Sequence, residues 1–428
     1  MAGVDLTAEL AFRLSRAAGR SFHARRGVIA RDTRLSGPVL EAACAAGLAD
    51  AGCQVLLAGV LPAPAVSHLV RTQNLDLGCV VSASHNPPQD NGIKFYDSSG
   101  LKFSPEEEER VEALLEDSDP NCGLGSFQAF ERAREDYLQF LRGVQPKLPL
   151  RGVKLVVDCA YGATWATAPV LLGEVGADLV LVGTEPDGAR INSTGAAALS
   201  ELQSRVRDTG ADLGVAFDGD GDRCMFVDHR GEVVEGDRLM GALAPSLWAW
   251  GELAAPGVVF TVLANRGAEE HLRARGFEVL RVPVGDRHVA WALRQQGWSL
   301  GGEPSGHIIF ARHAPTGDGL LTALVVLGVL QRVDKDLRSL VAPVPVYPQL
   351  RVDVPVVDRE RAMEDPAVVR AVREAERALL GHGRLVVRPS GTQSVIRVFA
   401  EGPDEGGLRK AVDLVVQALG RFRPSSLG

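Results

Sequence analysis

Residues 27–57 have the sequence GVIARDTRLSGPVLEAACAAGLADAGCQVLL. A short apolar run comes first, followed by a stretch of helix length, a glycine at position 52 and a second apolar run. Apolar runs separated in this way are typical of a β-α-β unit on a parallel or mixed sheet, and Gly52 stands where a helix C-cap would fall. The same order recurs at residues 153–181 and 257–280. The copies lie farther apart than the repeats of a solenoid protein, so they predict three similar α/β domains in tandem.

The last part of the chain follows a different plan. Prolines at positions 343, 345 and 348 mark a linker before it. We expect, in order, a strand, a charged helix, two strands and a final amphipathic helix, over residues 350–356, 360–380, 384–387, 395–400 and 407–419. This order predicts a small α+β domain at the C-terminus.

The domain organisation follows from these patterns. Two further linkers are expected around residues 145–150 and 251–257. The fold class is therefore predicted to be α/β, with three similar mixed-sheet domains and a smaller α+β domain. The expected boundaries are 1–148, 149–252, 253–344 and 345–428.

Composition excludes several classes of protein. The chain has 428 residues, of which 46% are hydrophobic, and 54 acidic against 46 basic residues give a formal net charge of −8. This hydrophobic content is too high for a disordered chain, and the net acidity argues against a nucleic-acid binder, which needs a basic face. The longest apolar run, residues 320–330, is too short to span a bilayer, and the N-terminus does not resemble a signal peptide.

Two residue types are used unusually. The six cysteines form no C-x-x-C pair, which indicates small buried side chains in a reducing cytoplasm. Only six of the basic residues are lysines, at positions 94, 102, 147, 154, 335 and 410. Genome base composition explains this arginine excess most simply, although arginine forks also suit phosphate groups.

The stretch VSASHNPPQDNGIK, residues 81–94, follows an apolar run. Ser84 therefore stands just beyond a predicted strand end, where α/β sheets place ligands. An ordinary Asn/Pro turn would explain the prolines but not Lys94 in a chain so poor in lysine. We therefore favour a nucleophilic or phosphorylated Ser84 with Lys94 as a proton-transfer group.

A second loop, FDGDGDR at residues 217–223, also follows an apolar run. Its carboxylates Asp218, Asp220 and Asp222 alternate with glycines and can converge on one hard cation such as Mg²⁺. An EF-hand is a poor alternative, because position 229 is His where that loop needs Glu. Without a cation, such crowding would raise the carboxyl pKa values.

A third loop, LGGEPSGH at residues 300–307, lies between apolar runs. Glu303, Ser305 and His307 suit hydrogen bonding to sugar hydroxyls, although a surface turn could have the same composition. Arg287 follows another predicted strand end upstream.

A fourth loop, RPSGT at residues 388–392, adds a candidate anion cradle. Guanidinium groups, hydroxyls and glycine-turn amides can together bind phosphate, and a hairpin turn with incidental arginines is the alternative. The residues concerned are Arg388, Ser390, Gly391, Thr392 and Arg397.

Taken together, the four loops point to one chemistry. They supply a serine nucleophile, a cation site, a polyol-binding loop and a phosphate cradle, a set that favours phosphoryl transfer on a phosphosugar. A hydrolase that works through an aspartyl phosphate is a weaker alternative, suggested by the D-x-D of residues 218–220. A phosphate on Ser84, and not on Asp218, would exclude it.

Over nearly its whole length the sequence resembles the α-D-phosphohexomutase superfamily, and within it most closely the bacterial phosphoglucosamine mutase branch. The resemblance rests on S-A-S-H-N-P, N-G-I-K, D-G-D-G-D-R-C, V-G-D-R, G-G-E-x-S-G-H and R-P-S-G-T, which occur in this order. It implies four domains around a central cleft, with one loop from each domain facing it. It also implies a soluble enzyme whose partner is a small phosphosugar, with no nucleic acid and no membrane, and is compatible with a homodimer.

The resemblance further implies the reaction. Ser84 would be phosphorylated in the active form and would share Mg²⁺ with Asp218, Asp220 and Asp222. Glucosamine 6-phosphate and glucosamine 1-phosphate would interconvert through a 1,6-bisphosphate, in the synthesis of UDP-N-acetylglucosamine for the cell wall. A hexosamine or hexose 1,6-bisphosphate would serve as activator.

Roles for other residues come from the same resemblance. Lys94 would be the acid/base, and Arg31, His85 and Arg223 would position or neutralise the transferring group. The sugar and its second phosphate would be held by Glu303, Ser305, His307, Arg287, Arg388, Ser390, Gly391, Thr392 and Arg397.

The sequence also departs from the family pattern. It starts after the F-G-T-D-G-I-R-G loop with which the family opens, so we expect the reading frame to extend upstream; a sugar-phosphate binding protein without turnover is the alternative. Pro304 replaces the usual Gln, which leaves phosphomannomutase or phosphoglucomutase specificity open. Residues 393–394 are Gln-Ser in place of Glu-Pro, and residues 193–196 lack the usual C-G-S-T-H-P that follows I-N.

Overall fold

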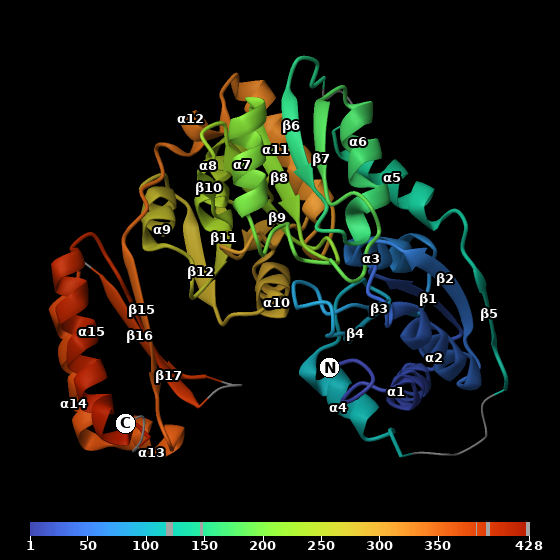
Figure 1. The fold of residues 1–428 in the computed structure, drawn as a ribbon, viewed down its shortest axis with the longest axis horizontal. Helices are drawn as coiled ribbons and strands as arrows, with labels where there is room; N and C mark the ends of the chain where they lie inside the picture. The colour runs from blue at the N-terminus through green and yellow to red at the C-terminus, as the bar shows by residue number, and fades with distance from the viewer. Residues whose placement is uncertain (117–122, 146–148, 382, 391–393, 425–428) are drawn as a thin grey trace. The chain divides into compact units, whose positions relative to one another are not determined.

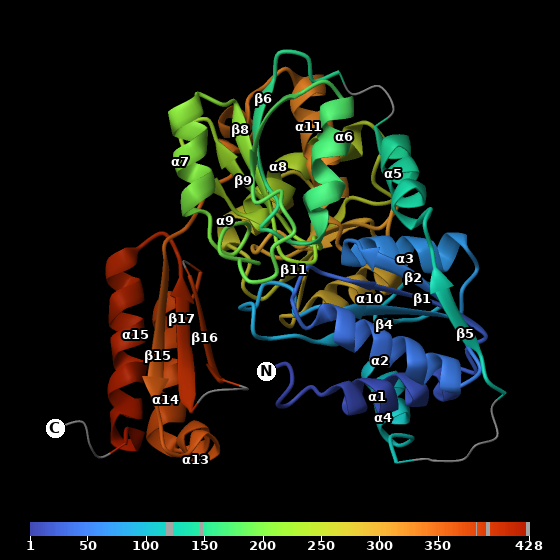
Figure 2. The same cartoon turned by 45° about the vertical axis from the view of Figure 1, so that its right-hand side comes forward.

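The computed structural model describes residues 1–116, 123–145, 149–381, 383–390 and 394–424 (Figures 1 and 2). The chain forms two compact units, which are described separately below. The first unit comprises residues 1–264 and 271–344, and the second comprises residues 265–270 and 345–428.

The first sheet has five strands in the order β4-β3-β1-β2-β5. All neighbours are parallel except β3 and β4, which are antiparallel. Helices α1 and α2 cover one face and α3 and α5 the other, as Figure 2 shows, with α4 beside α1. These elements are β1 (Arg26–Arg31), β2 (Gln54–Val60), β3 (Leu77–Val81), β4 (Ile93–Tyr96), β5 (Ser126–Ala129), α1 (Ala8–Ser21), α2 (Gly37–Asp50), α3 (Ala63–Thr72), α4 (Pro105–Glu112) and α5 (Ala133–Val144).

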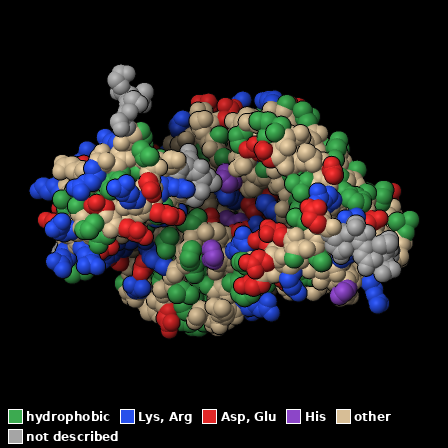
Figure 3. Space-filling model, turned by 90° about the horizontal axis from the view of Figure 1, so that it is seen from below, with side chains coloured by type: hydrophobic (Ala, Val, Ile, Leu, Met, Phe, Trp, Pro, Cys, Tyr) green, Lys and Arg blue, Asp and Glu red, His purple; other side chains and the backbone are tan. Residues whose placement is uncertain are grey.

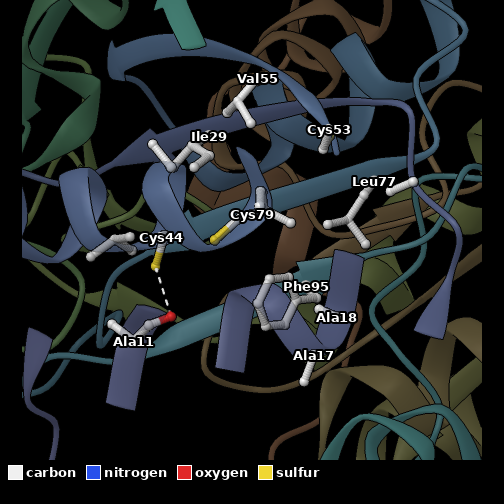
Figure 4. Close-up of a cluster of buried hydrophobic side chains, with 14 of the residues drawn as sticks. Ala11, Ala17, Ala18, Ile29, Cys44, Cys53, Val55, Leu77, Cys79 and Phe95 are labelled. Carbon is white, nitrogen blue, oxygen red and sulfur yellow. Dashed lines mark hydrogen bonds between the residues drawn. The ribbon is translucent and has the colours of Figure 1, made fainter. Parts of the chain in front are cut away.

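The core under α1 and α2 combines alanine and cysteine side chains with larger aliphatic and aromatic ones (Figure 4). Cys44 and Cys79 lie in it, and the Cys44 thiol points to the carbonyl oxygen of Ala11 at 4.0 Å. A Cβ atom at Gly47 would stand 2.2 Å from the carbonyl oxygen of Phe12, so this glycine lets the two helices meet at backbone distance. The five cysteines in the described residues are buried and free, as predicted, while Cys122 lies outside those residues.

The second sheet repeats the plan with the order β10-β9-β8-β6-β7. Strand β6 is parallel to β7 and β8, and β9 runs antiparallel to β8. The elements are β6 (Lys154–Asp158), η1 (Ala163–Ala166), α6 (Ala168–Glu174), β7 (Asp178–Val182), α7 (Ser200–Thr209), β8 (Leu213–Phe217), β9 (Cys224–Asp228) and β10 (Val233–Val234).

The third sheet has the order β12-β11-β13-β14, again with one antiparallel neighbour, β14. The strands of this sheet and the helices before, between and after them in the chain are α8 (Gly236–Ala249), β11 (Gly257–Thr261), α9 (Arg266–Arg273, of which residues 266–270 belong to the second unit), β12 (Glu278–Val282), α10 (Asp286–Gln296), β13 (Leu300–Gly302), β14 (Ile308–Phe310), α11 (Gly319–Val333) and α12 (Leu337–Val341). The apolar run 320–330 is a buried part of α11. Among the described residues, no helix has the length and apolar character needed to cross a membrane.

The predicted β-α-β units are therefore present three times, as β1-α2-β2, β6-α6-β7 and β11-α9-β12, each with parallel strands. Gly52, Gly176 and Gly276 follow the three helices with φ values of +87°, +89° and +82°. Glycine suits these positions because other residues are strained at positive φ.

The second unit is an antiparallel sheet of order β15-β17-β16 packed on helices. Its elements are β15 (Gln349–Pro355), α13 (Arg359–Glu364), α14 (Pro366–Leu379), β16 (Arg384–Pro389), β17 (Val395–Glu401), α15 (Glu405–Leu419) and η2 (Gly420–Phe422). The single helix predicted over residues 360–380 is wrong. It is two helices, because the Asp365 side chain caps α14 and Pro366 occupies its first turn.

Figure 3 shows Lys and Arg side chains among Asp and Glu on the face that it draws. This mixture accords with a chain whose acidic and basic totals nearly balance.

Candidate functional site

Three of the four loops selected from the sequence occupy equivalent places in the first unit. Each follows the parallel strand beside the first strand of its sheet and leads into an antiparallel neighbour: β3 to β4, β8 to β9, and β13 to β14. Loops at the carboxyl ends of parallel strands are where α/β sheets bind ligands. The repeated topology explains why chemistry-bearing residues recur there in each domain.

Ser84 stands at the tip of the first loop in a left-handed conformation, with φ of +50°. Its hydroxyl donates a hydrogen bond to Asp218 Oδ2 at 2.6 Å, so the first two loops meet at the predicted nucleophile. A Cβ atom at Gly219 would lie 2.7 Å from the Ser84 carbonyl oxygen. Glycine at 219 is therefore needed for this close approach.

The backbone of Ser84 is supported by two buried residues that sequence analysis did not select. The Ser84 N–H donates to Ser82 Oγ at 2.9 Å, and the Ser82 hydroxyl donates to Asp32 Oδ2 at 2.6 Å. Asp32 directly follows β1, and Arg34 and Asn192 donate to the Ser84 carbonyl oxygen. The available sequence signal for Asp32 and Arg34 is their position just after the first apolar run of the segment 27–57.

The three carboxylates of the second loop are buried close together. Ligand atoms of Asp218, Asp220 and Asp222 all lie within 4.8 Å of one another. Asp220 Oδ1 and Asp222 Oδ1 are buried without a hydrogen-bond partner in the described part of the chain. Buried carboxylate oxygens left without donors are costly unless a cation binds them. The geometry therefore fits a hard divalent cation with oxygen ligands.

Two lysines approach this cluster from β4 and the segment after it. Lys94 Nζ donates to Asp220 Oδ2 at 2.6 Å and lies 4.0 Å from Asp222 Oδ2. Lys102 Nζ pairs with Asp286 and lies 3.7 Å from Asp222 Oδ2. Burial lowers the pKa of Lys94, but Asp220 and Asp222 outweigh it and hold that pKa well above its usual value. Lys94 is therefore charged at neutral pH.

The crowded carboxyl groups titrate differently from one another. Burial, and then repulsion from Asp222 and Asp220, raises the pKa of Asp218 to about 7. Burial would also raise the pKa of Asp222, but His307 and Lys94 hold it well below its usual range. The rise expected from crowding thus holds for Asp218, while Asp222 is governed by its cationic neighbours.

His85 lies beside the Ser84 hydroxyl, and Arg223 lies beside Asp218, which accepts a hydrogen bond from that hydroxyl. The Arg223 backbone N–H donates to Asp218 Oδ1 at 3.2 Å, and its Nε lies 3.9 Å from Asp218 Oδ2 with no hydrogen-bond partner among the described residues. His85 Nδ1 lies 3.4 Å from Ser84 Oγ. Burial, and then Arg223, lowers the pKa of His85, which favours the neutral imidazole.

The side chains of the third loop have two different sets of contacts. Ser305 Oγ donates to Glu303 Oε2 at 3.0 Å, and Glu303 Oε1 accepts from the Gly285 N–H at 3.2 Å. His307 is buried, with Nδ1 3.6 Å from Asp222 Oδ2 and Nε2 accepting from the Gly317 N–H at 3.2 Å. His307 therefore contacts the carboxylate cluster, so its predicted role in binding sugar hydroxyls gains no support from these contacts.

Two predicted arginines are engaged elsewhere. Arg31 Nε pairs with Glu41 at 3.0 Å, and Arg287 Nη1 pairs with Glu108 at 3.0 Å. Among the described residues, neither guanidinium forms a hydrogen bond or ion pair with Ser84 or with the carboxylate cluster.

The fourth loop belongs to the second unit. Arg388 on β16 stands directly opposite Arg397 on β17, and Arg397 in turn stands opposite Asp353 on β15. Ser390 is buried at the end of β16, while Gly391 and Thr392 lie outside the described residues. Like charges directly opposite on a sheet repel, which favours binding of an anion between them.

Comparison with known families gives one consistent match. Models of the phosphoglucomutase/phosphomannomutase family match alpha/beta/alpha domain I at residues 1–121, domain II at 135–231, domain III at 235–347 and the C-terminal domain at 352–418.

Individual proteins agree with these matches. The chain is 42% identical to a phosphoglucosamine mutase of Rhodopseudomonas palustris, over 97% of this chain and 94% of that protein. It is also 42% identical to a phosphoglucosamine mutase of Desulforamulus reducens, over 99% and 97%. Among solved structures, a phosphoglucomutase/phosphomannomutase family protein of Burkholderia thailandensis has a TM-score of 0.85 and 26% identity, over 99% of this chain and 96% of that one.

Proposed function

The chain belongs to the phosphoglucomutase/phosphomannomutase family, and on this premise we propose that it interconverts glucosamine 6-phosphate and glucosamine 1-phosphate. The observation that carries the proposal is the contact between the Ser84 hydroxyl and Asp218, beside a buried carboxylate cluster and a charged lysine. The amino-sugar substrate is supported by relatives named phosphoglucosamine mutase at 40–42% identity over nearly the whole chain. The product would enter amino-sugar synthesis for the cell wall, in the cytoplasm.

In the proposed reaction the phosphoryl group moves between Ser84 Oγ and a sugar hydroxyl. Phosphorylated Ser84 would transfer its group to glucosamine 6-phosphate to give the 1,6-bisphosphate. The bisphosphate would turn over and return its 6-phosphoryl group to Ser84. A hexosamine or hexose 1,6-bisphosphate would restore the phosphoserine when an intermediate escapes.

Charged side chains around Ser84 would assist this transfer. Lys94 would carry the proton exchanged with the reacting oxygen, and its raised pKa means that its resting form is the charged one. Arg223 has an Nε without a partner in the described residues, which leaves it able to donate to a phosphoryl oxygen. His85, beside Ser84 Oγ, would orient the group. Such positioning and charge neutralisation are the main means of catalysing phosphoryl transfer.

Asp218, Asp220 and Asp222 would hold Mg²⁺, which supplies positive charge next to the transferring phosphoryl group when it is bound. The unpartnered buried oxygens of Asp220 and Asp222 support this assignment.

Glu303 and Ser305 would bind sugar hydroxyls. Arg388, Ser390 and Arg397, with Gly391 and Thr392, would bind the phosphate that is not reacting. Arg31 and Arg287 would also bind phosphate, and for this Arg31 would have to release Glu41 and Arg287 would have to release Glu108.

The domain boundaries 1–148, 149–252, 253–344 and 345–428 are part of the same proposal. Each of the four sheets falls within one of these ranges, which supports them.

The decisive test replaces the nucleophile. We expect Ser84→Ala to abolish Mg²⁺-dependent conversion of glucosamine 6-phosphate, because no other group in the proposed reaction carries the phosphoryl. Ser98→Ala, at an exposed serine farther along the same segment, is the matched control and should retain full activity. Intact mass and peptide mapping should find phosphate on Ser84. Unchanged turnover in Ser84→Ala, or phosphate on Asp218, would contradict the proposal.

Substrate choice needs a separate comparison, because Pro304 stands where relatives of this branch carry Gln. The Pro304 carbonyl oxygen accepts from the Gly236 N–H at 2.9 Å, so position 304 is tied to the start of α8 beside the sugar-binding loop. We expect kcat/KM to be highest for glucosamine phosphate among glucosamine, glucose and mannose phosphates. A higher value for mannose or glucose phosphate would move the chain to the corresponding branch of the family.

A further inference from the structure

One arginine beneath the Ser84 loop is completely enclosed. The Arg34 side chain has 0% exposure. A guanidinium group carries five N–H donors, and each buried donor needs an acceptor. All five are used. Nε donates to Asp32 Oδ2 (2.9 Å), Nη1 to the carbonyl oxygens of Pro87 and Asp90 (2.9 Å for Asp90), and Nη2 to those of Ser84 (3.0 Å) and Asn86 (2.8 Å).

The four carbonyl groups all belong to one short loop, residues 84–90. A single side chain therefore fixes that loop at four points along its backbone. Asn192, from the second domain, reinforces two of these points, since its Nδ2 donates to the carbonyl oxygens of Ser84 at 2.7 Å and Asn86 at 2.9 Å.

This fixation acts on a residue in an unfavourable conformation. Ser84 has φ of +50°, and left-handed backbone is unfavourable for a non-glycine residue. Its N–H is bound by Ser82 and its carbonyl by Arg34 and Asn192, so the backbone is held on both sides. The result is a hydroxyl 2.6 Å from Asp218 Oδ2.

We propose that Arg34 is a positioning residue for phosphoryl transfer, which holds the Ser84 loop in the strained conformation that aims Oγ at the carboxylate cluster. This inference rests on the proposed function for its kinetic consequence. Arg34 itself has every donor engaged with the protein, so it acts through Ser84 and not on the substrate.

A purely structural role makes a different prediction. An arginine that only stabilised the fold would, when removed, lower the melting temperature and leave kcat and KM of the remaining folded protein unchanged. A positioning residue lowers kcat with little change in KM, because it affects the transition state more than substrate binding.

The test uses chemical rescue of Arg34→Ala. This variant leaves a cavity lined by the Asp32 carboxylate and four carbonyl oxygens, which complements a free guanidinium ion. We expect kcat to fall about 100-fold, as for a small misplacement of a reacting group, and KM to stay nearly constant. Millimolar guanidinium should restore part of kcat saturably.

Arg281→Ala is the matched control for rescue. Arg281 Nη1 also donates to backbone carbonyl groups, those of Thr261, Val262 and Ala264, but these lie at the end of β11 and in the segment after it. Guanidinium should not raise kcat of this variant or of the wild type. Unchanged kcat in folded Arg34→Ala, or an equal guanidinium effect on Arg281→Ala, would overturn the proposal.

Asn192→Ala keeps the inference testable if Arg34→Ala does not fold. It removes donors to two of the same carbonyl groups without leaving a buried charge, so we expect a smaller fall in kcat at unchanged KM. Unchanged kcat in this variant would count against the loop-positioning role.

Amide hydrogen exchange separates this inference from the proposed function. In the unliganded protein, the amides of Arg34→Ala and Asn192→Ala should exchange faster than those of wild type at residues 84–91, but not in the strands of the first sheet. If the two variants exchange faster but the wild type turns over no phosphosugar, only the proposed function is contradicted. Unchanged exchange would overturn the role of Arg34, whatever the turnover.

Discussion

The first two domains place an aspartate at the same point of the same fold unit. Asp32 directly follows β1 and Asp158 ends β6, and both have 0% exposure. Each accepts hydrogen bonds from a backbone N–H two residues on and from a hydroxyl group: Arg34 N–H and Ser82 for Asp32, Ala160 N–H and Thr194 for Asp158.

The two aspartates differ in one partner. Asp32 is paired with the Arg34 guanidinium, whereas Asp158 takes its third hydrogen bond from the neutral Gly195 N–H at 2.8 Å. In the first domain, the pairing with Asp32 holds the Arg34 guanidinium where it also donates to carbonyl groups of the Ser84 loop. In the second domain, the corresponding loop carries Asp218, Asp220 and Asp222. An arginine placed like Arg34 would compete with a cation for these carboxylates. The same scaffold thus supports the proposed phosphoryl carrier in one copy and the proposed cation site in the next.

The largest expected effect comes from breaking the charged pair. Asp32→Asn leaves the Arg34 charge buried without compensation, so we expect unfolding free energy to fall by about 3–5 kcal/mol. Asp158→Asn, the matched change in the second domain, removes no ion pair and should cost less at pH 7. Urea unfolding of both variants measures the difference, and equal losses would mean that the guanidinium is not what distinguishes the two sites.

A smaller effect concerns pH. Burial raises the pKa of Asp158 to about 6. Because the folded state then holds a proton that the unfolded state releases, Asp158 contributes stability at low pH that is lost as pH rises through about 6. The stability of wild type relative to Asp158→Asn should fall by about 1 kcal/mol between pH 5 and pH 8. Asp178→Asn, at an exposed carboxylate on the adjacent strand β7, is the control, and a difference that stays flat with pH would contradict the assignment.

The smallest effect lies in the second unit, where charges meet on a sheet surface and not in a core. Arg388→Gln removes one of two like charges directly opposite each other, so we expect unfolding free energy to rise by about 0.2–1 kcal/mol without phosphate. The same variant should lose the stabilisation that inorganic phosphate gives to wild type. Arg370→Gln, on the exposed side of α14, is the control in a thermal melt. Equal phosphate stabilisation of wild type and Arg388→Gln would remove Arg388 from the phosphate site.

The sequence located the chemistry-bearing loops better than the contacts between them. Apolar runs placed Ser84 and the Asp218 loop at strand ends, and the structure brings Ser84 to Asp218. The position of Arg31 in sequence did not show that its guanidinium turns to Glu41 on α2. Lys102 was visible only as one of six lysines, since its partners Asp222 and Asp286 are more than a hundred residues away.

By itself, the sequence determined the four-domain α/β order, the three β-α-β units and the residue types at the strand ends, because periodicity, glycine caps and loop composition are local properties. Only the tertiary structure decided which charges are buried together. Arg34 lies three residues from Arg31, yet one is enclosed with five acceptors and the other is paired with a helix carboxylate. That difference depends on which loops fold over each side chain, and contacts between distant segments carry no signature in the local sequence.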